Sequence, residues 1–75
     1  MIHAYVMLNV ETGTERIVLE RLKTVDGVEE AYISYGVYDI ILRVKANTMQ
    51  DLKEEITRKI RTTNQVLSTL TLIQQ

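Results

Sequence analysis

The side chains that most often perform catalysis or hold metals are scarce in this chain, which has one histidine, His3, and no cysteine. A histidine that acts as a general acid or base needs a partner within hydrogen-bond reach. No recognisable motif places Asp26, Asp39 or Asp51 beside His3. We therefore interpret His3 as a strand residue at an interface and predict no catalytic residue.

The paired carboxylates Glu29-Glu30 and Glu54-Glu55 have no histidine or cysteine at metal-ligand spacing, so we predict solvated charges there, no metal site and no cofactor. The cations Arg58, Lys59 and Arg61 lie where the last turns of a helix are expected, and cations there complement the helix dipole. Glycine-rich phosphate loops, serine elbows and zinc-protease motifs do not occur in the sequence. These patterns favour a protein that is not an enzyme.

The segment from Ser34 to Asp39 (SYGVYD) is the most distinctive part of the chain. Gly36 is suited to the turn of a β-hairpin. Asp39 directly follows Tyr38 at the start of an otherwise apolar strand, where a carboxylate is a poor strand former. Two interpretations stay open: Asp39 caps the turn through its own backbone, or its carboxylate accepts a hydrogen bond from the ammonium group of a ligand.

Strict alternation of apolar and polar residues predicts a first strand over residues 2–10. A first helix follows, with Val18, Leu22 and Val25 on one stripe. Thr12 and Glu15 have the spacing of a capping box at its start, and Gly27 is suited to its end.

The clearest helical pattern is the apolar stripe of Met49, Leu52, Ile56 and Ile60, which Thr48 is positioned to cap. Runs rich in β-branched and aromatic residues predict strands over residues 28–35, 38–44 and 66–73, the first two joined in a hairpin at Gly36. The order β-α-β-β-α-β predicts an α+β, ferredoxin-like fold: one domain over residues 1–75, with a four-stranded antiparallel sheet and both helices on one face.

The size and charge of the chain limit the classes of function that it could have. A domain of 75 residues has a small core, and without cysteine or a metal site it is expected to gain stability by forming an oligomer. The formal net charge of −1 argues against autonomous binding to nucleic acid, which would require nearly every lysine and arginine. No signal peptide or membrane-spanning run is recognisable, so a cytoplasmic location is expected.

The sheet face opposite the helices should be polar in a monomer. If Ile2, Val6, Leu8, Ile40, Leu42 and Val44 face the helices, the other face carries Tyr5, Met7, Ile41, Leu67, Thr69, Thr71 and Ile73. A large exposed apolar patch usually marks an interface. We therefore predict dimerisation through this face, with Tyr5, Met7, Ile41 and Leu67 in the interface; a monomer or a shifted strand register is the alternative.

An ordered set of short patterns resembles the effector-binding domain, or RAM domain, of the Lrp/AsnC family of transcriptional regulators. The set comprises the AYV of the first strand, the TG turn, the DGV before the second strand, the hairpin Gly36-x-Tyr38-Asp39, and the final strand with Val66, Thr69, Thr71 and Ile73. The resemblance covers residues 2–73. The chain departs from it at Thr12 and at Asn64-Gln65, which stand where the family often has proline and proline-glycine.

The resemblance implies a domain that dimerises through its sheet, with dimers assembled into a ring, commonly an octamer, and free amino acids bound between dimers. The implied ligand-binding residues are Tyr35, Gly36, Tyr38, Asp39, Thr69 and Thr71. Family members usually carry a helix-turn-helix domain that these 75 residues lack, so the resemblance implies an effector module that senses amino acids without contacting DNA and that can co-assemble with full-length regulators.

Three alternatives stay open from the sequence. An ACT-type amino-acid domain has the same fold, with its ligand at the turn between the first strand and the first helix. A small dimeric α+β-barrel enzyme has a similar sheet-paired dimer, with His3 as the only histidine for catalysis. A structural oligomeriser would bind no ligand.

Overall fold

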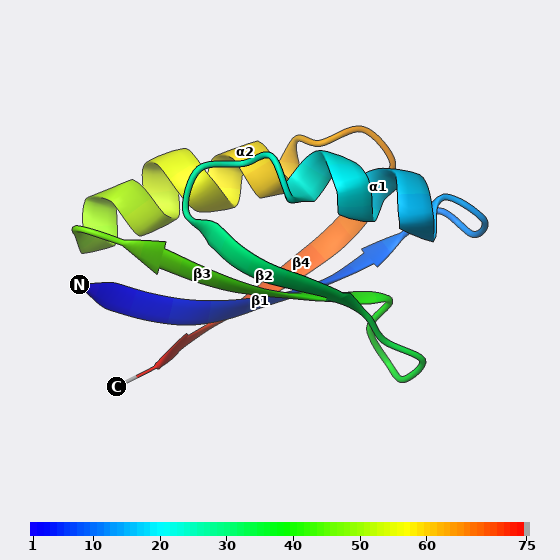
Figure 1. Ribbon diagram of the computed structural model, residues 1–75, viewed down its shortest axis with the longest axis horizontal. Helices are drawn as coiled ribbons and strands as arrows, with labels where there is room; N and C mark the ends of the chain where they lie inside the picture. The colour runs from blue at the N-terminus through cyan, green and yellow to red at the C-terminus, as the bar shows by residue number, and fades with distance from the viewer. Residues whose placement is uncertain (75) are drawn as a thin grey trace.

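A computed structural model describes residues 1–74 of the chain (Figure 1). The elements follow in the order β1 (Ile2–Val10), α1 (Glu15–Leu22), β2 (Val28–Ile33), β3 (Ile40–Ala46), η1 (Asp51–Ile56), α2 (Thr57–Arg61) and β4 (Val66–Gln74). In η1 the helix widens to the π form and continues directly into α2. The predicted β-α-β-β-α-β order is therefore confirmed.

The four strands form one antiparallel sheet in the order β2-β3-β1-β4, and the helices cover one of its faces (Figure 1). This is the predicted ferredoxin-like arrangement. The alternation in β1 is clear enough that its predicted bounds match the structure. The hairpin strands differ from the predicted ones: β2 ends at Ile33 and β3 begins only at Ile40, because residues 34–39 form the connecting loop.

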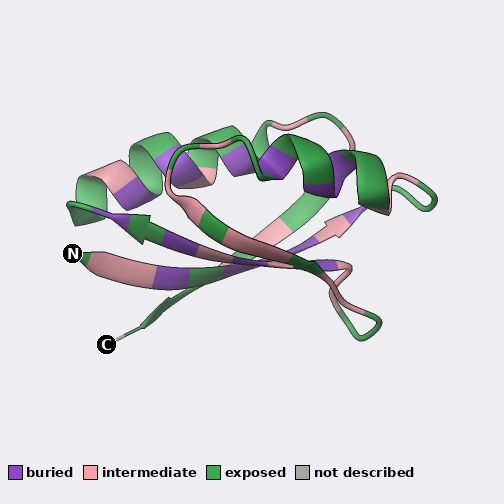
Figure 2. Ribbon diagram, viewed as in Figure 1, coloured by how far each residue is buried: buried purple, intermediate pink, exposed green. Residues whose placement is uncertain are grey.

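The core lies between the helices and the sheet (Figure 2). Along β1 and β3 every second side chain is buried, including Leu8 and Leu42, and helical Leu22 and Ile60 pack against them. All buried side chains within residues 1–74 are apolar. Burying one leucine or isoleucine side chain contributes roughly 1.5–3 kcal/mol to the free energy of folding. This apolar layer is therefore the main source of stability within a single subunit.

The register of β4 corrects the predicted face of three residues. Thr69, Thr71 and Ile73 lie opposite Leu8, Val6 and Ala4, which are buried beneath the helices, so they occupy the helix side and not the open face. The open face of β4 carries Leu70 and Leu72 instead, opposite Met7 and Tyr5. The strand VLSTLTLI has apolar residues in both alternating sets, so periodicity could not choose between its two faces.

Leu67 lies in a β-bulge between the pairs Val10–Val66 and Asn9–Ser68, where the register gives it no partner. Its side chain is 65% exposed. The bulge shifts the register by one residue, which is the physical reason that the face of β4 was predicted wrongly.

The two helix starts differ in their capping. The predicted capping box at Thr12 is wrong: α1 begins at Glu15, and the hydroxyl of Thr14 donates to the carbonyl of Glu11 instead of accepting from the helix. The predicted cap at Thr48 is confirmed, since the backbone N–H of Asp51 donates to its hydroxyl at 3.0 Å.

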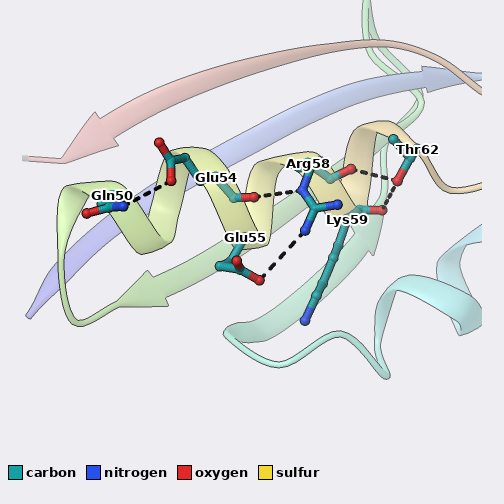
Figure 3. Close-up of polar contacts among 6 residues, drawn as sticks. All are labelled: Gln50, Glu54, Glu55, Arg58, Lys59 and Thr62. Atoms are coloured by element: carbon teal, nitrogen blue, oxygen red, sulfur yellow. Dashed lines mark hydrogen bonds and ion pairs between the residues drawn. The ribbon is translucent and has the colours of Figure 1, made fainter.

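Polar contacts along η1 and α2 stay within the helix (Figure 3). Gln50 donates to the carboxylate of Glu54, and Arg58 donates to the carbonyl of Glu54 while its guanidinium lies 3.8 Å from the carboxylate of Glu55. Thr62 donates to the carbonyl of Arg58. No helix within residues 1–74 is both long and apolar enough to cross a membrane.

Candidate functional site

The most distinctive concave surface lies between the β2–β3 loop and the turn that joins β1 to α1. We call it the hairpin hollow, and its volume is about 520 Å³. Both connections lie at one end of the sheet, because the beginning of β3 pairs with the end of β1. The residues that line the hollow are Gly13, Glu15, Arg16, Ile33, Ser34, Tyr35, Gly36 and Asp39.

Asp39 fastens the loop to the centre of the sheet. Its carboxylate Oδ2 accepts a hydrogen bond from the backbone N–H of Val10 at 2.9 Å, and its own N–H donates to the carbonyl of Leu8 at 3.0 Å. Its carbonyl accepts from the N–H of Ser34 at 2.8 Å, which closes the loop. The carboxylate therefore caps the neighbouring strand β1 and not its own turn.

The second carboxylate oxygen of Asp39 accepts no hydrogen bond from residues 1–74. The backbone N–H groups of residues 35–38 likewise donate to no protein group in that range. Of these residues, Tyr35 and Gly36 line the hollow, which thus combines a carboxylate that has spare acceptor capacity with two unpaired backbone donors. Glu15 and Arg16 add one charge of each sign.

Gly36 is not required by the backbone geometry of the loop. Its φ is not positive, unlike those of Gly13 and Gly27. A Cβ atom built on Gly36 would meet only the Ser34 hydroxyl oxygen, at 3.8 Å. The hairpin is present as predicted, but no contact within the subunit requires a glycine at this position.

The side chains at the tip of the loop point away from the protein core. Tyr35 is 96% exposed and Val37 is 84% exposed. Tyr38 is half-buried and does not line the hollow. Of the four hairpin residues predicted to bind a ligand, the structure brings Tyr35, Gly36 and Asp39 together around one hollow.

The two predicted threonines lie elsewhere in the subunit. Thr71 lines a separate hollow of about 300 Å³ between β4 and the η1–α2 helix, which we call the helix–strand hollow. Thr69 lies opposite Leu8 on the helix side of β4 and is not among the residues that line the hairpin hollow. A single subunit therefore does not bring these threonines to the hairpin hollow.

Sequence reasoning missed Gly13, Glu15 and Arg16 as residues of the hairpin hollow. The signal was present in the predicted topology, because the β1–α1 and β2–β3 connections of a ferredoxin-like fold lie at the same end of the sheet. The two turns that distinguish the Lrp/AsnC interpretation from the ACT-type alternative therefore line one hollow.

The open sheet face changes in character from one end to the other. Opposed residues form one row of apolar side chains across all four strands, and the next row is mixed. Beyond them, His3 and Lys45 both approach the carboxylate of Glu29, each at 3.6 Å. The apolar row consists of Tyr32, Ile41, Met7 and Leu70, and the mixed row of Glu30, Arg43, Tyr5 and Leu72.

His3 therefore lies on the open face beside a carboxylate, although Glu29 was not among the partners weighed from the sequence. Glu30 and Arg43 form a second ion pair on this face. These contacts account for the charges of β2 and β3 as a surface network.

The protein-family model of the Lrp/AsnC ligand binding domain matches residues 3–74 of this chain. The regulatory protein AsnC of Haemophilus influenzae is 38% identical over 56 residues, which are 75% of this chain and 37% of that protein. AsnC of Escherichia coli strain K12 is 36% identical over 55 residues, 73% of this chain and 36% of that protein. The chain thus spans a little over a third of the length of these curated relatives.

Solved structures show the same similarity. The crystal structure of FFRP-DM1 superposes with a TM-score of 0.93 at 39% identity, covering 100% of both chains. A hypothetical protein of Pyrococcus horikoshii, PHS023, gives a TM-score of 0.91 at 39% identity, covering 100% of this chain and 90% of that one. The structure of E. coli AsnC gives 0.88 at 27% identity, covering 97% of this chain and 50% of that one.

Proposed function

The chain belongs to the Lrp/AsnC ligand-binding domain family of transcription regulators, and we propose that it senses a free amino acid and couples binding to assembly. The observation that carries the proposal is that the spare oxygen of Asp39 and the unpaired N–H groups of Tyr35 and Gly36 lie in one hollow, the hairpin hollow.

An amino acid presents an ammonium group and a carboxylate on one carbon atom. In the proposed complex, Asp39 accepts a charge-assisted hydrogen bond from the ammonium group. The backbone N–H groups around Gly36 donate to the carboxylate, which approaches closely because Gly36 has no side chain. A volume of about 520 Å³ is within the range of small-molecule sites, which is roughly 300–1,000 Å³.

The ligand is proposed to lie between subunits. Tyr35 and Val37 extend from the loop with little contact to their own subunit, as expected of residues that a neighbour covers. In this arrangement Tyr38 supports the loop, and a neighbouring subunit supplies Thr69 and Thr71. This also accommodates their distance from the hairpin hollow within one subunit.

The dimer is proposed to form between two open sheet faces. The apolar row contains the paired residues Met7 and Ile41. Burying this row in a dimer would contribute about 25 cal/mol of free energy per Å² of apolar surface removed from water. Tyr5 and Leu72 of the mixed row extend this apolar surface, and Leu67 lies at its margin in the bulge. Dimers then assemble into a ring, with an octamer as the proposed size, and full-length regulators of the family are proposed partners.

The proposed role requires neither catalysis nor direct contact with DNA. The matched curated relatives are named as regulatory proteins. The 75 residues carry a formal net charge of −1, so a DNA-binding surface is not proposed for them. A cytoplasmic location is proposed because regulators of transcription act there in bacteria.

Calorimetric titration with each of the twenty amino acids tests the proposal, with Asp39→Asn as the critical variant. Asparagine retains an oxygen that can accept from the N–H of Val10, so it removes the charge while keeping the cap. A hydrogen bond to a charged group contributes about 1.5–3 kcal/mol, so the affinity should fall roughly 10–100-fold. Asp26→Asn, outside the hairpin hollow, is the control.

Undiminished affinity in Asp39→Asn would exclude the assignment of the ammonium site. Loss of binding in Gly13→Val with full binding in Asp39→Asn would favour the ACT-type arrangement. Turnover of a substrate that His3→Ala abolishes would favour the enzyme. Native mass measurement with and without the amino acids tests the coupling to assembly, because a ligand shifts an assembly equilibrium only if it binds the two states differently.

A further inference from the structure

Thr71, which a neighbouring subunit is proposed to bring to the amino-acid ligand, belongs to a larger group of side chains. It lines the helix–strand hollow together with residues from both parts of the second helix. A subunit that places Thr71 against a ligand therefore places these side chains near the same ligand. The lining consists of two cations, two hydroxyl groups and two apolar side chains: Lys53, Arg61, Thr57, Thr71, Leu52 and Ile73.

The two cations of the helix–strand hollow have no acidic partner in the described chain. Neither Lys53 nor Arg61 lies within 4 Å of a carboxylate of residues 1–74. In contrast, Arg58 of the same helix is engaged by the carbonyl of Glu54 and the carboxylate of Glu55 (Figure 3). The hollow therefore presents two positive charges that a ligand could neutralise.

The two hydroxyl groups of this hollow also have no hydrogen-bond partner within residues 1–74, although Thr57 and Thr71 are half-buried. A threonine within a helix commonly donates to a carbonyl of the preceding turn, as Thr62 and Thr63 do at the end of α2. Thr57 does not, so its hydroxyl remains available as a donor. Two cations and two free donors on one hollow are suited to an anionic group.

The charges around a ligand shared by two subunits do not balance. The hairpin hollow of one subunit contributes the carboxylates of Asp39 and Glu15 and the guanidinium group of Arg16. The helix–strand hollow of the neighbour contributes Lys53 and Arg61. Three cations then face two carboxylates. A ligand of net charge −1 neutralises the remaining positive charge, whereas a ligand of zero net charge leaves it without a partner in an interface that excludes water.

We propose that the amino acid bound by this protein has an anionic side chain, of the size of aspartate or glutamate. This rests on the proposed function and adds to it the class of side chain that the site selects. Asp39 holds the α-ammonium group, and the side-chain carboxylate enters the helix–strand hollow of the neighbour. There Lys53 and Arg61 neutralise it, and the two threonines donate hydrogen bonds to it.

Calorimetric titration of the full 75-residue chain with an acid and its amide tests the selected side chain. The pairs are glutamate with glutamine and aspartate with asparagine, because the members of each pair have nearly the same size and differ by one charge. For at least one pair, the acid should bind at least about tenfold more tightly than the amide.

Variants of the two cations locate the selectivity. Lys53→Gln and Arg61→Gln should each lower the affinity for the acid about tenfold or more and leave the affinity for the amide unchanged. Lys59→Gln is the matched control, because it removes the same charge from the same helix outside the helix–strand hollow. It should leave the ratio of the two affinities unchanged.

The ratio of the affinities for acid and amide separates this proposal from the proposed function. Asp39→Asn should weaken both ligands by the same factor, since both carry the α-ammonium group. Amides that bind as tightly as the acids, or a ratio that neither Lys53→Gln nor Arg61→Gln changes, would overturn the anionic side chain while binding that depends on Asp39 remained. Equal weakening of acid and amide by these two variants would also overturn it. An absence of binding by all twenty amino acids would overturn the proposed function as well.

Discussion

The two faces of the sheet use the same strands for different purposes. On the covered face, Leu8, Leu42 and Val44 are buried against the helices, and every fully buried side chain within residues 1–74 is apolar. On the open face, the alternate residues of the same strands form the apolar row at one end. At the other end lies the charged network of His3, Glu29 and Lys45. The covered face provides the stability of a subunit, whereas the open face has the composition of a surface that meets another protein.

The largest expected effect contrasts two consecutive residues of β3. Leu42→Ala opens a cavity in the covered face and should lower the free energy of unfolding by about 2–5 kcal/mol. Ile41→Ala, on the open face, should cost far less when measured at a protein concentration low enough to dissociate oligomers. Urea denaturation measures the free energy of unfolding of both variants. Equal decreases in the two would contradict the distinction between a covered and an open face.

The substitution Gly27→Ala tests how closely the chain packs where α1 leads into β2, next to Ile56 and Lys45. The φ of Gly27 is +96°, and an added Cβ would lie 2.6 Å from Ile56 Cδ1 and 2.9 Å from the Lys45 carbonyl oxygen. Gly27→Ala therefore combines a strained backbone with a clash and should destabilise the fold by roughly 1–3 kcal/mol. Thermal unfolding followed by circular dichroism measures the loss. A melting temperature equal to that of the parent protein would contradict this close packing.

Met7→Lys tests whether the open face is an interface. It places a charge in the centre of the apolar row, so a face-to-face dimer would confront two such charges near its centre. We expect the proposed dimer to be lost in this variant, while the unfolding free energy of the isolated subunit changes by less than about 1 kcal/mol. Analytical ultracentrifugation provides the measurement. Ile17→Lys, an exposed apolar residue of α1, is the control, and a dimer in both variants would refute the proposed interface.

The smallest expected effect on stability is that of Gly36→Ala. The methyl group would meet only the Ser34 hydroxyl, so the unfolding free energy should change by less than about 0.5 kcal/mol. The same variant should weaken amino-acid binding, because the methyl group lies where the ligand carboxylate is proposed to approach. Calorimetry beside thermal melting separates the two effects. Unimpaired binding would remove Gly36 from the site.

The sequence allowed the fold to be predicted where one pattern dominated. The alternation of β1 and the stripe of Leu52, Ile56 and Ile60 each define a single buried face and were confirmed, although Met49, the first residue of the predicted stripe, is 38% exposed. β4 failed this condition because its apolar residues occupy both alternating sets, and the bulge at Leu67 then reversed the predicted face. Long-range pairing with β1, which periodicity does not contain, decided the outcome.

The candidate site was predictable only within one segment of the chain. Gly36 and Asp39 are close in sequence, so the hairpin brought them together as expected. The contact of Asp39 with Val10 joins residues from different strands, and no local pattern indicates it. Glu15 and Arg16 reach the hollow through the topology of the whole sheet, so they required the fold to be known first.

The pairing of β1 with β4 has a consequence for how the protein is made. β1 lies inside the sheet, between β3 and β4, and His3 is paired with Gln74 from the opposite end of the described chain. During translation, β1 is synthesised before β4, so one of the two edges of β1 stays unpaired until β4 is synthesised. Contacts this distant in sequence slow folding. The nascent chain therefore carries an unpaired strand edge until β4 emerges, which is the period when chaperones would protect it best.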